Sequence, residues 1–489
     1  MRRYLSAGLV AFWLVMLAVL LYRTWPVRSS RPMVPERVES AVGEEWMGVY
    51  QGQRKIGYTR NRLTAEAAGF VFLEEALLRL TVAGTPQTVR TRMEGHTNPD
   101  FALRDISFEL GSGVGDLHAS GTVSGKSLHL TLRTGAEESE QTIALKDPLY
   151  VPSTLRASVR AGGLQPGRHV EAMVFDPTTL QNDRLQLTVE REEVVPGTTA
   201  DAERGWRVRE EFHGLVTTAW IDPTGVVLRE EGPLGLTLVH ESAEAALQQG
   251  WETATALDLV AKAAVPVARR LDDPRQRTAL RVRLSGIAED QIPSDDEQVR
   301  QGSVLAITTP DVASLASYRL PYRGLEQASD VAPTVFLQSD HPRIRALARE
   351  ILGGEQDAKR AAVRLNDWVY EHLRKVPTIS IPNALQVLDM GEGDCNEHAV
   401  LLAALGRASG LPTRLIAGAV YVDGAFFYHA WCEVWLERWV SIDPALHQFP
   451  ADATHIKLVV GDPEEQMKML GIIGRLGVEV LGDGQESGG

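Results

Sequence analysis

The residues best suited to chemistry lie in one stretch near the C-terminus, between Gly391 and Ala445. Cys395 stands at the start of an apolar segment that predicts a helix, and His429 and Asp443 follow on two short, aromatic-rich segments that predict neighbouring strands. A cysteine, a histidine and an aspartate are the groups that a thiol nucleophile, its base and the acid orienting that base require. The stretch therefore predicts a nucleophilic thiol site.

The predicted helix would make Cys395 reactive. Apolar residues recur at helical spacing from Asn396 to Ser409, Asp394 is an acceptable N-cap, and Gly410 is a natural stop. Cys395 then falls in the first turn, where unpaired backbone N–H groups and the helix dipole stabilise a thiolate. We expect its pKa to be lowered there, and the same N–H groups to form part of an oxyanion hole.

The predicted strands position the base and its partner. Alternation along the middle strand would place His429, Trp431 and Glu433 on one face, and Ala430, Cys432 and Val434 on the other. The three strand segments are 413–422, 426–435 and 438–443. If they pair as antiparallel neighbours, Asp443 could reach Nδ1 of His429. It would then fix the tautomer whose other nitrogen takes the thiol proton.

Two structural roles compete for the cysteines. Cys395, His398, His429 and Cys432 form a Cys₂His₂ set that could ligate zinc, and Cys395 could instead pair with Cys432 in a disulfide. The alternation disfavours both, because His429 and Cys432 should point to opposite faces of their strand. We expect no metal and no other cofactor, with His398 and Cys432 as bystanders.

Three short motifs resemble those of a known family. They are Gly393-Asp394-Cys395-Asn396-Glu397-His398-Ala399, His429-Ala430-Trp431-Cys432-Glu433-Val434 and Asp443-Pro444. Over roughly residues 330–462 the chain resembles the transglutaminase-like branch of the papain-like cysteine hydrolases. The resemblance implies an α+β core in which the cysteine helix packs against an antiparallel sheet.

The resemblance also implies roles for the residues. Cys395 would be the nucleophile, His429 the general base and acid, and Asp443 the residue that orients His429. Trp431, inside the second motif, is a candidate substrate-binding residue. Animal-type members carry calcium sites, but we interpret the acidic loop Pro293-Ser294-Asp295-Asp296-Glu297 as a solvated turn.

Length and charge restrict the remaining possibilities. The chain has 489 residues, more than a single core normally serves, so several domains are expected. The net charge of −14 and the lack of a basic patch in the sequence argue against nucleic-acid binding. A mildly acidic surface on the folded part of the chain is the simplest interpretation.

The pattern along the chain predicts six segments. Residues 1–23 are a transmembrane signal anchor, because Leu5–Tyr22 is uncharged over about the length that crosses a bilayer. The others are a linker at 24–44, an antiparallel β-rich domain at 45–241, a helical and mixed connector at 242–329, the α+β catalytic domain at 330–462 and a C-terminal tail at 463–489. Within the connector, Ala- and Leu-rich periodicity predicts helix over 242–275.

These observations lead to one functional expectation and two alternatives. We expect a single-pass, membrane-anchored cysteine hydrolase with its body on the periplasmic face, acting on an amide bond of a peptide or protein through a thioester acyl-enzyme. The same chemistry could transfer the acyl group to an amine and crosslink proteins. A catalytically silent module that binds proteins in the cell envelope is the other alternative. In either case the β-rich domain could contact an envelope protein partner.

Overall fold

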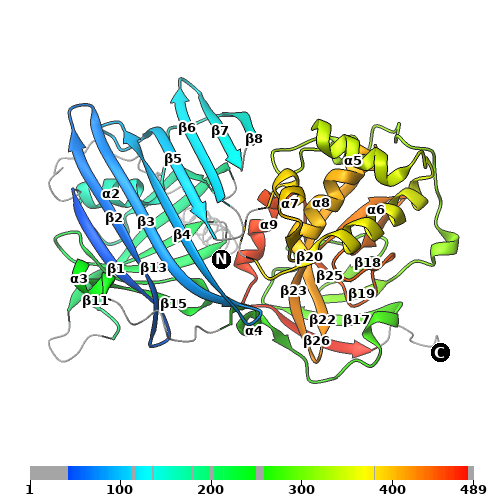
Figure 1. Cartoon of the computed structure of the whole chain (residues 1–489). Helices are drawn as coiled ribbons and strands as arrows, with labels where there is room; N and C mark the ends of the chain where they lie inside the picture. Colours follow the sequence, from blue (N-terminus) through cyan, green and yellow to red (C-terminus); the bar gives the residue numbers. More distant parts are fainter. Residues whose placement is uncertain are drawn as a thin grey trace, which may run out of the picture.

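The computed structural model consists of two lobes, drawn side by side in Figure 1. It describes residues 42–112, 116–134, 137–177, 180–197, 203–212, 214–248, 258–378, 380 and 382–482. The transmembrane anchor predicted at 1–23 and nearly all of the linker lie outside these residues. Among the described helices, none is both long and apolar enough to cross a membrane.

The N-terminal lobe is one curved, 15-stranded sheet, which confirms the β-rich character predicted for residues 45–241. Its order is β8-β7-β6-β5-β4-β3-β2-β1-β15-β14-β13-β12-β11-β10-β9, so successive strands are neighbours and β1 joins β15 in the middle. The pairing is antiparallel except between β9 and β10. The strands are β1 (Gly43–Gln51), β2 (Arg54–Glu66), β3 (Gly69–Val82), β4 (Thr85–Thr97), β5 (Leu103–Gly111), β6 (Asp116–Ser124), β7 (Ser127–Thr134), β8 (Glu137–Ala144), β9 (Leu149–Tyr150), β10 (His169–Asp176), β11 (Gln181–Val194), β12 (Arg204–Phe212), β13 (Leu215–Ile221), β14 (Val227–Glu231) and β15 (Leu236–Glu241).

The two halves of this sheet share one apolar core with a helix. α2 (Pro152–Ala161) contributes the fully buried Leu155, which belongs to the same cluster as Phe72 of β3 and Val208 of β12. Alternating strand sequences supply one apolar side chain in every two residues, which is what a sheet with one buried face needs. The lobe therefore folds around its own core.

The connector contains less helix than its Ala- and Leu-rich sequence predicted. Among the described residues of 242–275, the α-helices are only α3 (Ala243–Leu247) and α4 (Leu259–Ala263). Pro266 and Pro274 limit helix in this region, because proline lacks an N–H donor and disfavours helix at the residue before it. The other connector elements are β16 (Val265–Pro266), η4 (Pro274–Gln276), β17 (Ala279–Ser285), η5 (Glu289–Gln291), β18 (Gln298–Gln301), β19 (Val304–Thr308), η6 (Val312–Ser314) and η7 (Ser329–Val331), while η2 (Pro233–Gly235) lies in the N-terminal lobe just before β15.

Four helices pack together in the C-terminal lobe. They are α5 (Pro342–Leu352), α6 (Ala358–His372), α7 (Ala384–Met390) and α8 (Cys395–Ala408). A side chain caps the start of each one, from His341, Asp357, Asn383 and Asp394 respectively. α5 and α7 end at Gly353 and Gly391, which have the left-handed backbone that glycine adopts readily. α8 lies among the other three and against the sheet.

The sheet beside α8 contains the three predicted strands. β23 (Ala425–Trp435) pairs antiparallel with β22 (Thr413–Val422) and with β24 (Trp439–Ile442). β25 (Ile456–Val460) and β16 complete a five-stranded sheet. Ala430, Cys432 and Val434 belong to the same core cluster as α8, so the predicted alternation along β23 is confirmed for this face.

Residues 463–482, which we had assigned to a C-terminal tail, fold back onto the molecule. α9 (Pro463–Gln466) contacts β22 and β25, and η8 (Met467–Gly471) contacts β25. β26 (Gly477–Gly482) pairs antiparallel with β17 and completes the four-stranded sheet β18-β19-β17-β26. Val478 and Val480 pack against one core cluster, which is the two-residue period of a strand.

Candidate active site

A capping box shapes the start of α8 around Cys395. The side chain of the N-cap residue Asp394 accepts a first-turn N–H at 2.9 Å, and Glu397 accepts the Asp394 N–H at 2.8 Å. The other oxygen of Glu397 accepts the Thr378 hydroxyl at 3.0 Å and also the Ser380 hydroxyl. These bonds fix the first turn, and Cys395 with it, against the loop that precedes α7.

The surroundings of the Cys395 sulfur favour the neutral thiol. Burial and the nearby carboxylates of Asp394 and Glu397 raise the pKa of Cys395 well above its usual range, whereas its place at a helix start had led us to expect a lowered pKa. The Ala430 N–H donates to the sulfur, which by itself lowers the pKa of Cys395. This effect is smaller than the combined effect of burial and the carboxylates. Cys395 therefore needs a base to take its proton when it reacts.

Strand β23 places a candidate base beside Cys395, on an unpaired part of its edge. In the described residues, β24 pairs with 432–435 and β16 with 425–426, so the edge between them faces no strand. The Ala430 N–H on this open stretch contacts the Cys395 sulfur, and His429 is the residue before it. His429 and Cys395 line one cavity of about 260 Å³.

Asp443 binds His429 through the nitrogen opposite to the one we predicted. Its Oδ2 lies 2.7 Å from Nε2 of His429, not from Nδ1. Asp443 directly follows β24, whose last residue, Ile442, pairs with Cys432, three residues beyond His429 on β23. Nδ1 of His429 is consequently the nitrogen left for the thiol proton.

The Asp443 carboxylate is completely buried and fully hydrogen-bonded. Its Oδ1 accepts the N–H groups of Ala445 at 2.7 Å and Leu446 at 2.9 Å. Burial alone would raise its pKa, but the charge and hydrogen bonds of His429 and His455 hold the pKa of Asp443 well below its usual range. Asp443 is thus an anion that can stabilise a protonated His429.

The walls of the cavity are mostly apolar. In the part of the chain that the structure describes, they include no Asp, Glu, Lys or Arg. Leu415 and Ala417 come from β22, Val400 from α8, and Met469 and Ile473 from the segment around η8. The fold-back of residues 463–482 therefore supplies one wall of the cavity that contains Cys395.

Trp431 does not line this cavity. Its side chain is fully buried, with its ring centroid 6.1 Å from that of His429 and 5.1 Å from that of His455. A Cβ on Gly418 would lie only 2.6 Å from the Trp431 ring, so the absence of a side chain there makes room for the indole. Trp431 packs beneath the histidines, which differs from the substrate contact expected from sequence.

His455 is a polar residue at this site that the sequence analysis missed. Its Nε2 lies 3.0 Å from Oδ2 of Asp443, and its Nδ1 lies 3.0 Å from the carbonyl oxygen of Asp452. His455 immediately precedes β25 and is buried. A signal was present, since His455 and Lys457 are polar residues at alternate positions of an otherwise apolar segment.

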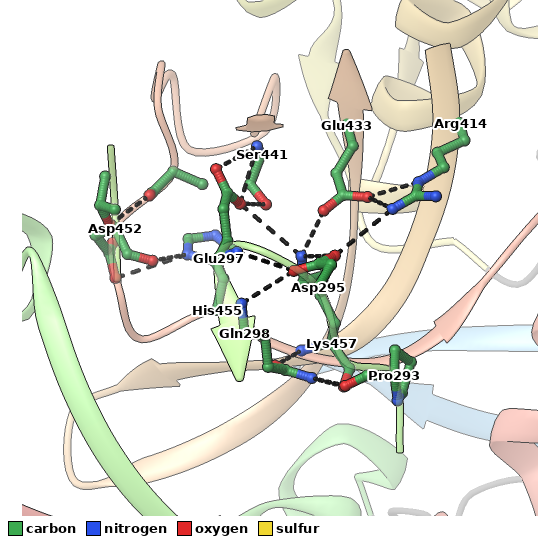
Figure 2. A network of polar contacts seen from close by, with 12 residues as sticks. Pro293, Asp295, Glu297, Gln298, Arg414, Glu433, Ser441, Asp452, His455 and Lys457 are labelled. Atoms are coloured by element: carbon green, nitrogen blue, oxygen red, sulfur yellow. Dashed lines mark hydrogen bonds and ion pairs between the residues drawn. The ribbon is translucent and has the colours of Figure 1, made fainter. Parts of the chain in front are cut away.

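Lys457 forms the centre of a buried ionic network on the same side of the sheet (Figure 2). Its Nζ lies 2.5 Å from Asp295 and 2.6 Å from Glu433, and Glu433 also binds Arg414. The acidic loop at 293–297 is therefore not the solvated turn that we expected. Its carboxylates add to Glu433 in neutralising the buried Lys457 cation.

Glu297, at the end of this loop, accepts hydrogen bonds from β24. Its carboxylate accepts the backbone N–H of Ser441 at 3.2 Å and the Ser441 hydroxyl at 2.7 Å. Burial raises the pKa of Glu297 to about 7, although the charge of Lys457 opposes this. The loop thereby braces the strand that ends at Asp443.

The bystander cysteine and histidine have structural contacts. The Cys432 thiol donates to the carbonyl oxygen of Ala399 at 3.2 Å, on the α8 side of the sheet, and both cysteines are free thiols. His398 Nδ1 lies 2.6 Å from the Asp394 carbonyl oxygen. The Cys₂His₂ set is therefore not directed toward one point.

One other group could offer metal ligands. The ligand atoms of His429, Asp443 and His455 lie within 4.8 Å of one another. Both imidazoles, however, approach the same Asp443 oxygen at hydrogen-bonding distances of 2.7 and 3.0 Å. Two N–H donors satisfy that oxygen without an ion.

Comparison with protein families gives the class of one part of the C-terminal lobe. Residues 345–444 match the family model of the transglutaminase-like superfamily. The chain therefore contains a transglutaminase-like domain, preceded by a large β-rich region. No curated protein matched the chain in a sequence search.

Solved structures give only distant likenesses. A proposed cysteine protease from Cytophaga hutchinsonii is 14% identical over 41% of this chain and 83% of its own, with a TM-score of 0.29. A β-barrel-like protein of a domain family of unknown function from Brucella abortus is 9% identical over 41% of this chain and 95% of its own, with a TM-score of 0.32. A proposed protease from Parabacteroides distasonis is 12% identical over 67% of this chain and 64% of its own, with a TM-score of 0.20.

Proposed function

We propose that the protein is a cysteine hydrolase that cleaves an amide bond in a peptide or protein. The observation that carries the proposal is the shared cavity of Cys395 and His429, with His429 hydrogen-bonded to a buried, ionised Asp443. A nucleophile, a base and an anion that orients the base are the parts that covalent acyl chemistry requires.

The reaction would begin with a neutral thiol. As the Cys395 sulfur attacks the carbonyl carbon, Nδ1 of His429 takes the thiol proton, and Asp443 stabilises the imidazolium that forms. His429 then gives this proton to the leaving amine nitrogen while the C–N bond breaks, which leaves a thioester on Cys395. Water, activated by His429, attacks the thioester and releases the acid and the thiol.

The helix start would stabilise the oxyanion. The N–H of Cys395 is the first of α8, so it has no acceptor one turn earlier within the helix. A donor in this place can bind the oxygen that becomes negative in the tetrahedral intermediate.

The cavity suggests which acyl groups would fit. With no Asp, Glu, Lys or Arg among its described lining residues, it would accommodate an uncharged side chain next to the scissile bond. Transfer to an amine in place of water uses the same acyl-enzyme, and adding an amine to the assay would reveal it as a second product.

Thiol alkylation tests the proposal without a known substrate. We expect the rate of Cys395 alkylation to depend on pH in a way that His429→Ala abolishes, in a Cys432→Ser background that removes the other thiol. If Cys395 instead titrates as an isolated thiol near about 8.5 and His429→Ala changes nothing, the site is catalytically silent.

Trapping would then identify the substrate. Incubated with a membrane extract, wild-type protein should carry a transient thioester at Cys395. Cys395→Ser should accumulate a more stable oxygen ester, and Cys395→Ala should carry neither. Mass spectrometry of the modified peptide would name the acyl group.

We further propose that residues 1–23 anchor the protein in a membrane, with the body on the periplasmic face. The uncharged stretch Leu5–Tyr22 supports this. Protease added to intact spheroplasts should digest the transglutaminase-like domain if this orientation is correct, and should spare it if the domain is cytoplasmic. Crosslinking in the same preparation would test for an envelope protein partner of the β-rich domain.

A further inference from the structure

The carboxylate that orients His429 is shared with a second imidazole. Oδ2 of Asp443 lies 2.7 Å from Nε2 of His429 and 3.0 Å from Nε2 of His455. Because Oδ1 is occupied by two backbone N–H groups, the carboxylate has four hydrogen-bond donors. An Asp443 that accepts four bonds while fully buried must be ionised.

The partners of His455 define its protonation state. Nε2 faces the Asp443 carboxylate, and Nδ1 faces the Asp452 carbonyl oxygen at 3.0 Å, with an oxygen of the Asp452 carboxylate 3.6 Å away. None of these acceptors can donate, so both ring nitrogens must carry hydrogen. Burial alone would lower the pKa of His455, but its bonds to Asp443 and Asp452 outweigh burial and raise the pKa to about 9.

The groups that face His455 come from three segments. Asp443, just after β24, binds its Nε2, the His429 ring on β23 has its centroid 6.0 Å away, and Asp452 binds its Nδ1 from the loop before β25. Arg275 neutralises part of the Asp452 charge at 2.8 Å. The Trp431 ring packs edge to face against the His455 ring, at an interplanar angle of 78°.

The ionic network around Lys457 fixes strand β25, which begins directly after His455. Lys457, two residues after His455, forms ion pairs with Asp295 and Glu433. Among the described residues, no hydrogen bond or ion pair joins Lys457 to Asp443. Figure 2 shows His455 with Asp452 on one side of this network. Residue 455 is thus fixed by β25 and by its own two hydrogen bonds.

We propose that His455 is a positioning residue for the thiol site, acting as a cation between Asp443 and Asp452 at neutral pH. It would hold the Asp443 carboxylate in place and draw part of its charge away from His429. A cation near Asp443 makes a protonated His429 less stable, so His455 would set the pH range in which His429 accepts the thiol proton. This inference rests on the proposed function, because it assigns a partner to the same base.

The test compares alkylation of Cys395 across pH in four proteins, all carrying Cys432→Ser. They are the background itself, His429→Ala, His455→Gln and His447→Gln. Glutamine at 455 can still donate to Asp443 but carries no charge. His447→Gln is the matched control, since Nε2 of His447 also lies 2.8 Å from a carboxylate, that of Asp367, but on the exposed surface.

The pH step that disappears in His429→Ala defines the contribution of His429. In His455→Gln we expect this step to move to higher pH by about one unit, because the cation that disfavoured imidazolium at His429 is gone. In His447→Gln it should not move. A folded His455→Gln protein with an unmoved step overturns the inference. A profile that His429→Ala leaves unchanged overturns the proposed function instead.

A measurement on the unsubstituted ring covers the case in which His455→Gln does not fold. With ¹³C-labelled histidine, one ring signal should stay in the imidazolium form up to about pH 8, well above the ordinary histidine pKa. If every histidine signal instead reports a neutral ring by that pH, His455 is not the proposed cation, whatever the thiol does.

Discussion

At the scale of single residues, Asp443 joins four hydrogen-bond donors at the thiol site. The Asp443 carboxylate accepts four hydrogen bonds, two of them from imidazole N–H groups. In Asp443→Asn, an uncharged amide that also has N–H donors would face those N–H groups. The loss of charge makes a protonated His429 less stable, so we expect Cys395 alkylation at pH 7 to slow about tenfold. Stopped-flow alkylation would measure this. Asp367→Asn, in the exposed pair with His447, should leave the rate unchanged, and an equal effect of both variants would contradict the role of Asp443.

His455 should also make the free energy of unfolding depend on pH. Its folded pKa is raised from 6.5 to about 9, so its contribution is complete below pH 6.5 and is lost as pH rises through 9. The loss amounts to about 3 kcal/mol in the free energy of unfolding. Urea unfolding at pH 6 and pH 9 should show this decrease in wild type and not in His455→Gln. A decrease of the same size in both proteins would refute the assignment.

The sequence predicted some residues of this site and missed others, because some of their contacts depend on distant parts of the chain. Cys395, His429 and Asp443 stand in motifs whose local spacing already places them on a helix start and two paired strands. His455 has no such motif, because its contact with Asp443 depends on β25 pairing with β22, a strand some 40 residues earlier. The nitrogen of His429 that binds Asp443 and the burial of Trp431 also depend on packing, which alternation alone does not specify.

At the scale of elements, Lys457 joins the sheet that carries His429 to the connector loop at 293–297. The Lys457 side chain is only 2% exposed, so Lys457→Met would leave the buried Glu433 and Asp295 with Arg414 as their main cation. Breaking one side of a buried ionic network costs about 3–5 kcal/mol. We expect a loss of this order in the free energy of unfolding, measured with urea at pH 7.

The chain offers a matched control for this substitution. Lys468 also pairs with a carboxylate, that of Glu465, but is 65% exposed. Lys468→Met should therefore change the free energy of unfolding by less than about 1 kcal/mol. Similar values for the two variants would mean that the Lys457 network contributes no more than a surface pair.

Elements were predicted best where local pattern and packing agree. The strands at 413–443 and the helix from Cys395 follow from alternation, capping and a terminal glycine. The predicted helix at 242–275 failed in the described part, because Val265 pairs with β23 and proline follows it. The acidic loop was misjudged since its charge suggested solvent, and the partner cation, Lys457, lies about 160 residues later.

At the scale of the whole molecule, the β-rich lobe touches the loop that supports the thiol. The Gln87 side chain, on β4, donates to the Pro377 carbonyl oxygen at 3.1 Å. The next residue, Thr378, binds Glu397 of the capping box. The N-terminal sheet is therefore connected to the start of α8 through one short loop, which no pattern in either domain alone could predict.

The segment after the transglutaminase-like domain should control access to Cys395. Met469 is buried in η8 and lines the cavity, and the Tyr428 hydroxyl donates to the neighbouring Ile472 carbonyl at 3.2 Å. Met469→Ala would remove part of this wall, so we expect a bulky maleimide to gain several-fold in rate relative to the small iodoacetamide. Met93→Ala is the control, because it removes a buried methionine from the distant N-terminal sheet. It should lower the free energy of unfolding by a similar amount, about 2 kcal/mol or more, and so shows what a general loss of stability does to the two rates. If both variants change the ratio of the two rates equally, the wall at Met469 does not limit access. If only Met469→Ala changes it, residues 463–482 belong functionally to the thiol site.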